Sequence, residues 1–192
     1  WWCSRKVRAL DVACRAAAMA QCEVEKAGAR RVIRLLLDAG ADMKGCPLHA
    51  AIGRNCLVDV VAELLAGGCN PNKMCDGQFP LAKAMSLGSL DVAECLLRAG
   101  ARTDHPAIVQ SVANAASAGN EAMVALFVRY GGDLNLACLG YTKSLTPLEF
   151  VGGGATAERA AALLVKYGAQ RPCDGGAKRS ATTEVSGRES AA

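Results

Sequence analysis

The sequence predicts an all-α fold, an α-solenoid in which about five helix-turn-helix units are stacked. Of its 192 residues 52% are hydrophobic but only 4% are aromatic, so alanine and leucine supply most of the apolar surface and favour closely packed helices. A phrase that ends near a glycine recurs along the chain, and a second phrase built around proline precedes it in several units. Two phrases that recur in a constant order are typical of stacked repeats.

The glycine phrase occurs five times, as Leu36–Ala41, Leu64–Cys69, Leu96–Ala101, Phe127–Gly132 and Leu164–Ala169. Its glycines lie at positions 40, 68, 100, 131 and 168, so successive copies are 28, 32, 31 and 37 residues apart. Glycine takes the left-handed conformation that follows many helices without a steric penalty. We therefore expect each phrase to end a helix.

The proline phrase predicts where helices begin. It occurs as Cys46–Ala51, Phe79–Ala84 and Thr146–Phe150, with proline in the second position each time. Proline is favoured at the first position of a helix, because its missing N–H would have no partner there. Gly88 and Gly119 each precede the next closing glycine by 12 residues, and we expect them to separate the two helices of a unit.

In combination the phrases resemble the signature of the ankyrin-repeat family, roughly D-G-x-T-P-L-H-x-A-A-x-x-G followed by V-x-x-L-L-x-x-G-A. Asp76–Leu81 with Leu96–Ala101, and Cys46–Ala51, carry the resemblance best. It implies antiparallel helix pairs joined by hairpin-like fingers. The predicted repeat domain spans 10–171, with units at approximately 10–42, 43–73, 74–105, 106–136 and 137–171. An N-terminal extension, interpreted as a cut edge, covers 1–9, and the composition of 172–192 predicts a disordered tail.

Several units depart from this pattern. The first unit has no proline phrase and a degenerate first helix before Arg30–Asp38, which we interpret as a terminal cap. The fourth unit keeps helical spacing but is expected to lack the proline and the histidine. Only Thr146 supplies a capping hydroxyl, whereas Cys46 and Phe79 are poorer caps. The finger at 133–145 is longer than the pattern requires.

Charge, hydropathy and cysteine usage exclude several classes of protein. The net charge of +4 is small and scattered, which argues against a nucleic-acid partner, and no apolar run reaches the ~18 residues of a membrane-spanning helix. The ten cysteines form no C-x-x-C pair, so we predict neither a metal site nor a cofactor. We expect mostly free thiols in a reducing compartment, the cytoplasm or nucleus, and a monomer.

No catalytic residue is predicted. His49 with Cys46 or Cys56 could form a thiol–imidazole pair, but the family resemblance gives His49 a structural role at a helix start. His105 lies in a turn-like finger segment without an acid or nucleophile beside it in sequence. The glycines at 152–154 lack the lysine of a phosphate-binding loop.

The resemblance implies that a protein partner binds to the fingers and to the inner helices, the first helix of each pair. The finger candidates are Lys73, Met74, Gln78, Arg102, Asp104, His105, Tyr141 and Lys143. The inner-helix candidates are Ala50, Arg54, Lys83, Ser86, Asn114, Ser117 and Phe150. This mixture of basic, apolar and aromatic side chains would suit a partner with acidic and apolar features.

Two functional interpretations remain at this stage, with a hidden thiol enzyme as a weaker third. The first is a protein-interaction scaffold, and the second is the regulatory or targeting module of a larger enzyme, channel or ubiquitin ligase. In addition, Gly132–Asn135 resembles the finger segment that an oxygen-sensing asparagine hydroxylase modifies in some ankyrin proteins. Asn135 is therefore a candidate acceptor.

Overall fold

The computed structural model describes residues 8–53, 56–136, 145–151 and 155–170. Ten α-helices lie in this part of the chain: α1 (Ala9–Met19), α2 (Glu23–Asp38), α3 (Pro47–Ala51), α4 (Val58–Ala66), α5 (Pro80–Ser86), α6 (Leu90–Arg98), α7 (Pro106–Ser117), α8 (Glu121–Arg129), α9 (Pro147–Phe150) and α10 (Ala155–Lys166). Within the described ranges none is long and apolar enough to cross a bilayer. Residues 1–7 of the extension, the tail, most of the long finger and the glycines at 152–154 lie outside these ranges.

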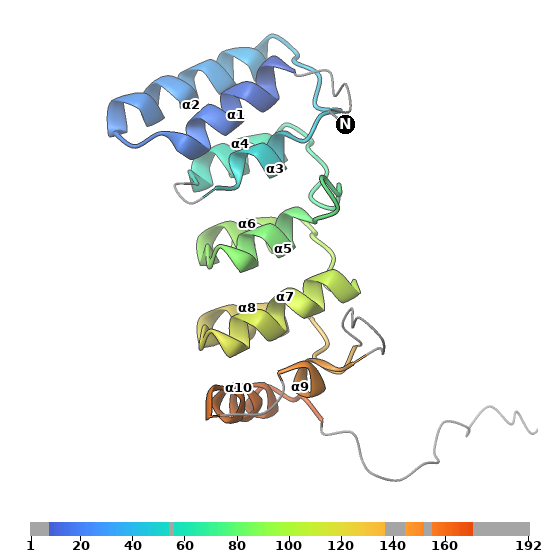
Figure 1. Ribbon diagram of the computed structural model, residues 1–192. Helices are drawn as coiled ribbons and strands as arrows, with labels where there is room; N and C mark the ends of the chain where they lie inside the picture. The colour runs from blue at the N-terminus through green and yellow to red at the C-terminus, as the bar shows by residue number, and fades with distance from the viewer. Residues whose placement is uncertain (1–7, 54–55, 137–144, 152–154, 171–192) are drawn as a thin grey trace, which may run out of the picture.

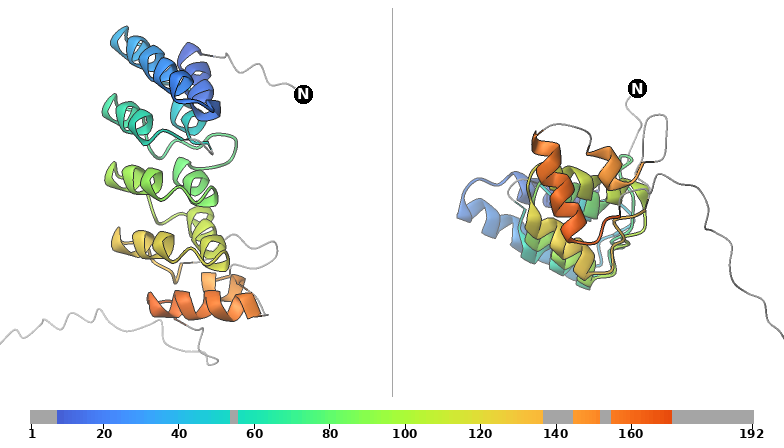
Figure 2. Two further views of the ribbon diagram at one scale, coloured as in Figure 1. Left: turned by 90° about the vertical axis from the view of Figure 1, so that its left-hand side faces the viewer. Right: turned by 90° about the horizontal axis from the view of Figure 1, so that it is seen from below.

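The helices form five successive pairs that stack in chain order, with α1 and α2 at one end and α9 and α10 at the other (Figures 1 and 2). Each helix packs against its partner, the odd-numbered helices also pack on one another, and α2, α4, α6 and α8 form a second row. This arrangement confirms the predicted all-α solenoid. The segments that lead from one pair to the next run along the edge beside the odd-numbered helices (Figure 1).

The glycine phrase ends a helix in every pair, as predicted. Gly40, Gly68, Gly100, Gly131 and Gly168 all have positive φ, between 72° and 99°. In each copy the residue after the glycine donates its N–H to the carbonyl of the first residue of the phrase, as Ala101 does to Leu96 at 2.9 Å. The glycine itself donates to the second residue, as Gly100 does to Leu97 at 3.0 Å. This pair of bonds is the Schellman motif, which satisfies carbonyls that the helix end leaves without a partner.

Proline stands at the first helical position of α3, α5 and α9, as predicted. Thr146 and Glu149 form a capping box at the start of α9, whereas Cys46 and Phe79 make no side-chain cap. The prediction that the fourth pair lacks the proline was wrong, whereas the histidine that follows the proline by two residues in Cys46–Ala51 is replaced by Ile108, as predicted. Helix α7 begins at Pro106, and Nδ1 of His105 accepts a hydrogen bond from the N–H of Ala107 at 3.1 Å.

One apolar core runs through the stack from α1 to Ala169, three residues after the end of α10. It includes Leu10, Ile33, Leu64, Leu96 and Leu164, each at most 1% exposed. In the fourth pair the fully buried Phe127 takes the place that leucine holds in the other copies of the glycine phrase. Small buried side chains fill the rest of the interface, as the alanine-rich composition predicts.

The first pair differs from the others in its outward face. Helix α1 is a regular helix of 11 residues rather than a degenerate one, and α2 begins at Glu23, seven residues before the predicted Arg30. The two helices expose five large apolar side chains to between 48% and 81%: Val12, Met19, Val24, Val32 and Leu35. Terminal caps of solenoids have polar outer faces, whereas in this pair large apolar side chains are exposed among charged ones such as Glu25 and Arg31.

Candidate functional site

The finger between α4 and α5 ends in a tight hairpin. Asp76 and Gly77 both have positive φ, 51° and 77°, as a type I′ turn requires. On either side of them Cys75 and Gln78 exchange backbone hydrogen bonds of 3.0 and 2.9 Å. The turn therefore holds the fingertip in one conformation and leaves Asp76 on the surface.

Two asparagine side chains join neighbouring fingers. Asn72 donates through Nδ2 to the carbonyl of Gly100 at 3.0 Å, and its Oδ1 accepts the N–H of Arg102 at 2.7 Å. Asn135 makes the equivalent contacts with the turn after α10. Its Nδ2 donates to the carbonyl of Gly168 at 3.4 Å, and its Oδ1 accepts the N–H of Gln170 at 2.7 Å. Both amides thus use donor and acceptor to fix one finger against the next.

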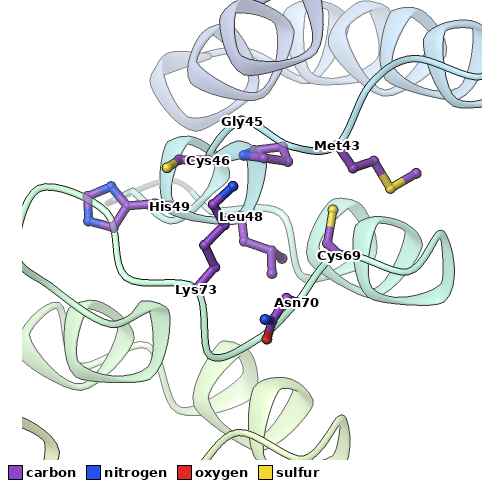
Figure 3. Close-up of a pocket in the computed structure, with 9 residues that line it drawn as sticks. Met43, Gly45, Cys46, Leu48, His49, Cys69, Asn70 and Lys73 are labelled. Carbon is purple, nitrogen blue, oxygen red and sulfur yellow. The ribbon is translucent and has the colours of Figure 1, made fainter. Parts of the chain in front are cut away.

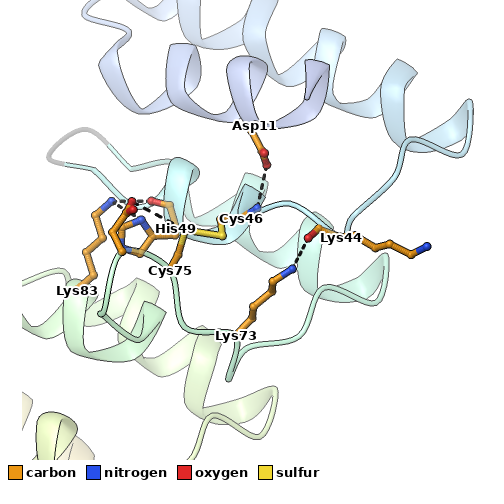
Figure 4. The surroundings of a disulfide bond; sticks show 8 residues. Asp11, Lys44, Cys46, His49, Lys73, Cys75 and Lys83 are labelled. Atoms are coloured by element: carbon orange, nitrogen blue, oxygen red, sulfur yellow. Dashed lines mark hydrogen bonds between the residues drawn. A yellow bond between two sulfur atoms is a disulfide. The ribbon is translucent and has the colours of Figure 1, made fainter. Parts of the chain in front are cut away.

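A disulfide joins Cys46, at the start of α3, to Cys75 at the fingertip of the next unit (Figure 4). Their Cα atoms are 6.2 Å apart although 29 residues separate them in sequence. At these two positions the expectation of free thiols was wrong, because stacking brings together cysteines that no local motif connects. Cys14, Cys22, Cys56, Cys69 and Cys95 are free, so the described cysteines are mostly free, as expected.

Burial suppresses the reactivity of several free thiols. It raises the pKa of Cys14 to about 12, with nearby Asp11 adding to the effect, and raises the pKa of Cys69 to about 11. Burial also raises the pKa of Cys56 and of Cys95. A nucleophilic cysteine has a lowered pKa, so these four thiols have the opposite character.

The described surface has no deep cavity beside the disulfide. The pocket there measures only about 10 Å³, about the space of one water molecule, and is lined by Met43, Leu48, His49, Cys69 and Lys73 among others (Figure 3). A larger hollow of about 350 Å³ lies at the other end of the stack between the α7–α8 turn and α10, where Ser117 and Arg159 contribute to its lining. The hollow is shallow and open, which suits a protein surface better than a buried small molecule.

A comparison with known proteins identifies the family of the repeats in part of the chain. A family model described as ankyrin repeats in three copies matches residues 18–107, which include the fingertip hairpin and the helix pairs on either side of it. Residues 18–107 therefore belong to the ankyrin-repeat family. None of the curated proteins compared with the chain matches it. Ankyrin repeats are generally protein–protein interaction modules and typically non-catalytic, which narrows the mode of action without naming a partner.

The predicted finger residues that the structure describes fall on two neighbouring fingers. Lys73 and Met74 are exposed, and Gln78 closes the hairpin. Lys73 also directs Nζ to the carbonyl of Lys44 on the preceding finger. On the next finger Arg102 and Asp104 form an exposed ion pair of 2.7 Å.

His105 is bound into the fold rather than presented to solvent. Its ring lies 4.5 Å from that of Phe79, centroid to centroid, in addition to its role at the start of α7. His105 thus has two structural contacts, and the same atoms would have to be released before it could contact a partner.

The predicted inner-helix residues that the structure describes lie on α3, α5, α7 and α9. Lys83 and Asn114 each precede the glycine that ends their helix by five residues, and Ser86 and Ser117 precede it by two. Asn114, Ser86 and Ser117 are exposed, whereas Ala50 and Phe150 are half-buried and pack against the core. Arg54, Tyr141 and Lys143 lie outside the described residues.

Lys83 is the least available of these side chains. Its Nζ donates to the carbonyl of His49 at 2.6 Å and lies 3.5 Å from Nδ1 of the same residue. Burial lowers the pKa of Lys83, and nearby Arg15 lowers it further. Lys83 therefore ties α5 to α3, so its replacement would perturb the fold as well as any contact with a partner.

Sequence reasoning missed two finger residues that the structure brings forward. Asn72 makes the same contacts as Asn135, and both stand four residues after a closing glycine, Gly68 or Gly131. Lys44 stands at the same offset after Gly40. This constant spacing, shared with Asn135, was the signal that could have identified Asn72 and Lys44.

Proposed function

We propose that the chain is a non-catalytic scaffold that binds a protein partner through its fingers and inner helices. The supporting observation is that the backbone of the fingers is fixed by turns and by Asn72 and Asn135, while several finger side chains stay exposed. Fixed backbone with free side chains lowers the entropy lost on association. Such a surface suits recognition of a folded protein or an extended segment of one.

The fingertip between α4 and α5 is the centre of this proposed surface. Met74 is 45% exposed and directly follows the exposed Lys73 in the sequence, so the fingertip presents both an apolar side chain and a cation. Methionine adapts its shape to a partner, and a cation favours acidic neighbours. We expect a partner segment that combines carboxylates with apolar side chains.

Comparative capture with surface variants tests the proposal. The test variant combines Lys73→Glu, Met74→Ala and Gln78→Ala on the finger. The matched control combines Arg129→Glu on α8, Val165→Ala on α10 and Asp91→Ala on α6, which reverse one charge and truncate one exposed apolar and one polar side chain away from the fingers and from the exposed face of α1 and α2. We expect the proteins bound by wild type to fall at least tenfold with the test variant and to persist with the control, as measured by quantitative mass spectrometry. Equal binding by the two variants would contradict the proposal.

One observation favours the second interpretation, a regulatory or targeting module within a larger assembly. The apolar side chains that α1 and α2 expose include Val24 at 81% and Leu35 at 61%. Several large apolar side chains exposed on one helix pair can mark a surface that other protein covers. Hydrogen exchange compared between this chain and the longest product of its coding sequence tests the point, since additional protection confined to α1 and α2 supports a covering segment and its absence argues against one.

We also propose that Asn135 can be hydroxylated, as its sequence context suggests. The residue is exposed, but its amide is engaged by the turn after α10. Treatment with an asparagine hydroxylase of the oxygen-sensing type should add one oxygen atom to the intact mass. The Asn135→Ala variant serves as the control, and modification of that variant would assign the reaction to another residue.

A further inference from the structure

We propose that four side chains around the Cys46–Cys75 bond form a zinc-binding site once that bond is reduced. His49, Cys75 and Asp76 each offer a ligand atom, and these atoms all lie within 4.8 Å of one another. The sulfur of Cys46 is bonded to that of Cys75 and so adjoins this cluster as a fourth donor. Figure 4 shows Cys46, His49 and Cys75 gathered between α3 and the fingertip of the next unit.

The separations suit a metal ion after only a small movement. Tetrahedral zinc with Zn–S bonds of about 2.3 Å and Zn–N bonds of about 2.0 Å keeps its ligand atoms roughly 3.3–3.8 Å apart. Bonded sulfurs are too close for that geometry, so the disulfide must open before both can bind the ion. The Cα atoms of the two cysteines, 6.2 Å apart, leave room for the sulfurs to separate without movement of the backbone.

The backbone holds both arms of the site without help from the disulfide. Cys46 is the N-cap of α3 and His49 is the third residue of that helix, so both stand at the same end of α3. The N–H of Cys46 donates to the carboxylate of Asp11 on α1 at 3.1 Å. Cys75 is held by its two backbone bonds with Gln78 across the hairpin. Reduction should therefore leave both thiols where they are, facing each other.

The charges and donor types favour zinc. Two thiolates and the carboxylate of Asp76 carry three negative charges, which balance the two positive charges of the ion and the one of Lys83, whose Nζ lies 2.6 Å from the carbonyl of His49. The positive charge of Lys83 therefore completes the charge balance of the zinc-bound site. Two sulfurs, an imidazole nitrogen and one oxygen select zinc over magnesium or calcium, which prefer oxygen ligands only.

The disulfide and the metal-bound form exclude each other. A thiol reductant transfers two electrons to the Cys46–Cys75 bond and becomes a disulfide itself, which leaves two protein thiols. Zinc then replaces the two thiol protons, which are released to solvent. Oxidation of the thiolates by a disulfide-class oxidant re-forms the bond and expels the ion. The cluster is thus a redox-controlled zinc site between two neighbouring repeats.

Cobalt(II) is the probe for this site, because thiolate-bound cobalt absorbs light whereas zinc does not. The chain should carry Cys3→Ser, Cys138→Ser and Cys173→Ser, which remove the cysteines outside the described residues. After reduction by a phosphine, we expect one cobalt ion per chain, with thiolate-to-cobalt charge-transfer bands and the ligand-field bands of a tetrahedral ion, both abolished by zinc. The oxidised chain should bind none. Absence of these bands in the reduced chain overturns the proposal.

Variants assign the ligands. Cys46→Ser and Cys75→Ser should each weaken cobalt binding by about 100-fold or more, since each removes a thiolate, and His49→Gln and Asp76→Asn by about tenfold or more. Cys22→Ser and Cys95→Ser are the matched controls and should bind as the parent does. The far-ultraviolet circular dichroism of each variant must match the parent. Unchanged bands in a folded Cys46→Ser/Cys75→Ser double variant, or loss of helicity on reduction of the parent, would refute the site.

Discussion

The turn after α8 predicts a specific energetic coupling. Four copies of the glycine phrase begin with leucine and end with alanine or cysteine, whereas the fourth copy begins with Phe127 and ends with Gly132. These two positions meet in the Schellman motif, where the N–H of Gly132 donates to the carbonyl of Phe127 at 3.0 Å. A Cβ atom on Gly132 would overlap the ring of Phe127. Glycine at this position is therefore required by the larger side chain.

The Gly132→Ala substitution should destabilise the protein through this overlap. Overpacking of a buried site costs about 1–3 kcal/mol, and Phe127 is fully buried, so its ring has little space to move. Phe127→Leu alone should cost about 1–2 kcal/mol through lost burial. The double variant restores the leucine–alanine combination of the other units, so the two changes should couple favourably by about 1–3 kcal/mol.

Urea unfolding followed by circular dichroism of wild type, both single variants and the double variant measures this coupling. Gly131→Ala is the control, since its cost arises from a φ of 79° and no atom lies within 4 Å of its Cβ. Forcing alanine into that conformation costs about 1–2 kcal/mol, and Phe127→Leu should not relieve it. If the effects of Gly132→Ala and Phe127→Leu add to within about 0.5 kcal/mol, the reasoning is wrong.

Three further predictions concern contacts elsewhere in the stack. Asn72→Ala removes two hydrogen bonds between fingers and should lower the free energy of unfolding by about 1–2 kcal/mol in urea titrations. The folded pKa of Cys14 is raised from 9.0 to about 12, so its stabilising contribution is complete below pH 9 and is lost as the pH rises towards 12. Wild type should therefore lose up to about 1.4 kcal/mol per pH unit more than Cys14→Ala in that range. Hydrogen bonds from Lys166 and Tyr167 lower the pKa of Glu121 below 4.5, so its contribution is present above pH 4.5 and is lost on acidification through the folded pKa. Glu121→Gln should lack this small component of the acid dependence of the melting temperature.

Features that depend on a single residue's backbone preference could be predicted from the sequence. The closing glycines and the prolines of the proline phrase determine where helices end and begin, because few other residues fit those conformations. The helix start at His105 and Pro106 was not predicted, because its cap residue is an uncommon one. Histidine is not among the residues strongly preferred as caps, so the start of α7 resembled a finger.

Contacts between units could not be predicted in the same way. The pairing of Cys46 with Cys75, and their approach to His49, depend on how one unit is placed against the next, and no short motif encodes that placement. Lys83 was predicted as a surface residue from its position on the inner helix, yet the half-buried side chain bonds to α3. The candidate binding surface therefore follows from the sequence in outline, while the availability of each side chain requires the packed stack.

The engagement of Asn135 by the last helix pair has a kinetic consequence. An enzyme that must grasp this amide has to wait until the bonds to Gly168 and Gln170 break, which requires the end of the stack to open. When opening and closing are fast, the rate of reaction follows the population of the open form. Every substitution that tightens the packing of α10 against α7 should slow the modification in proportion. The rate of Asn135 hydroxylation would then measure how often that end of the stack opens.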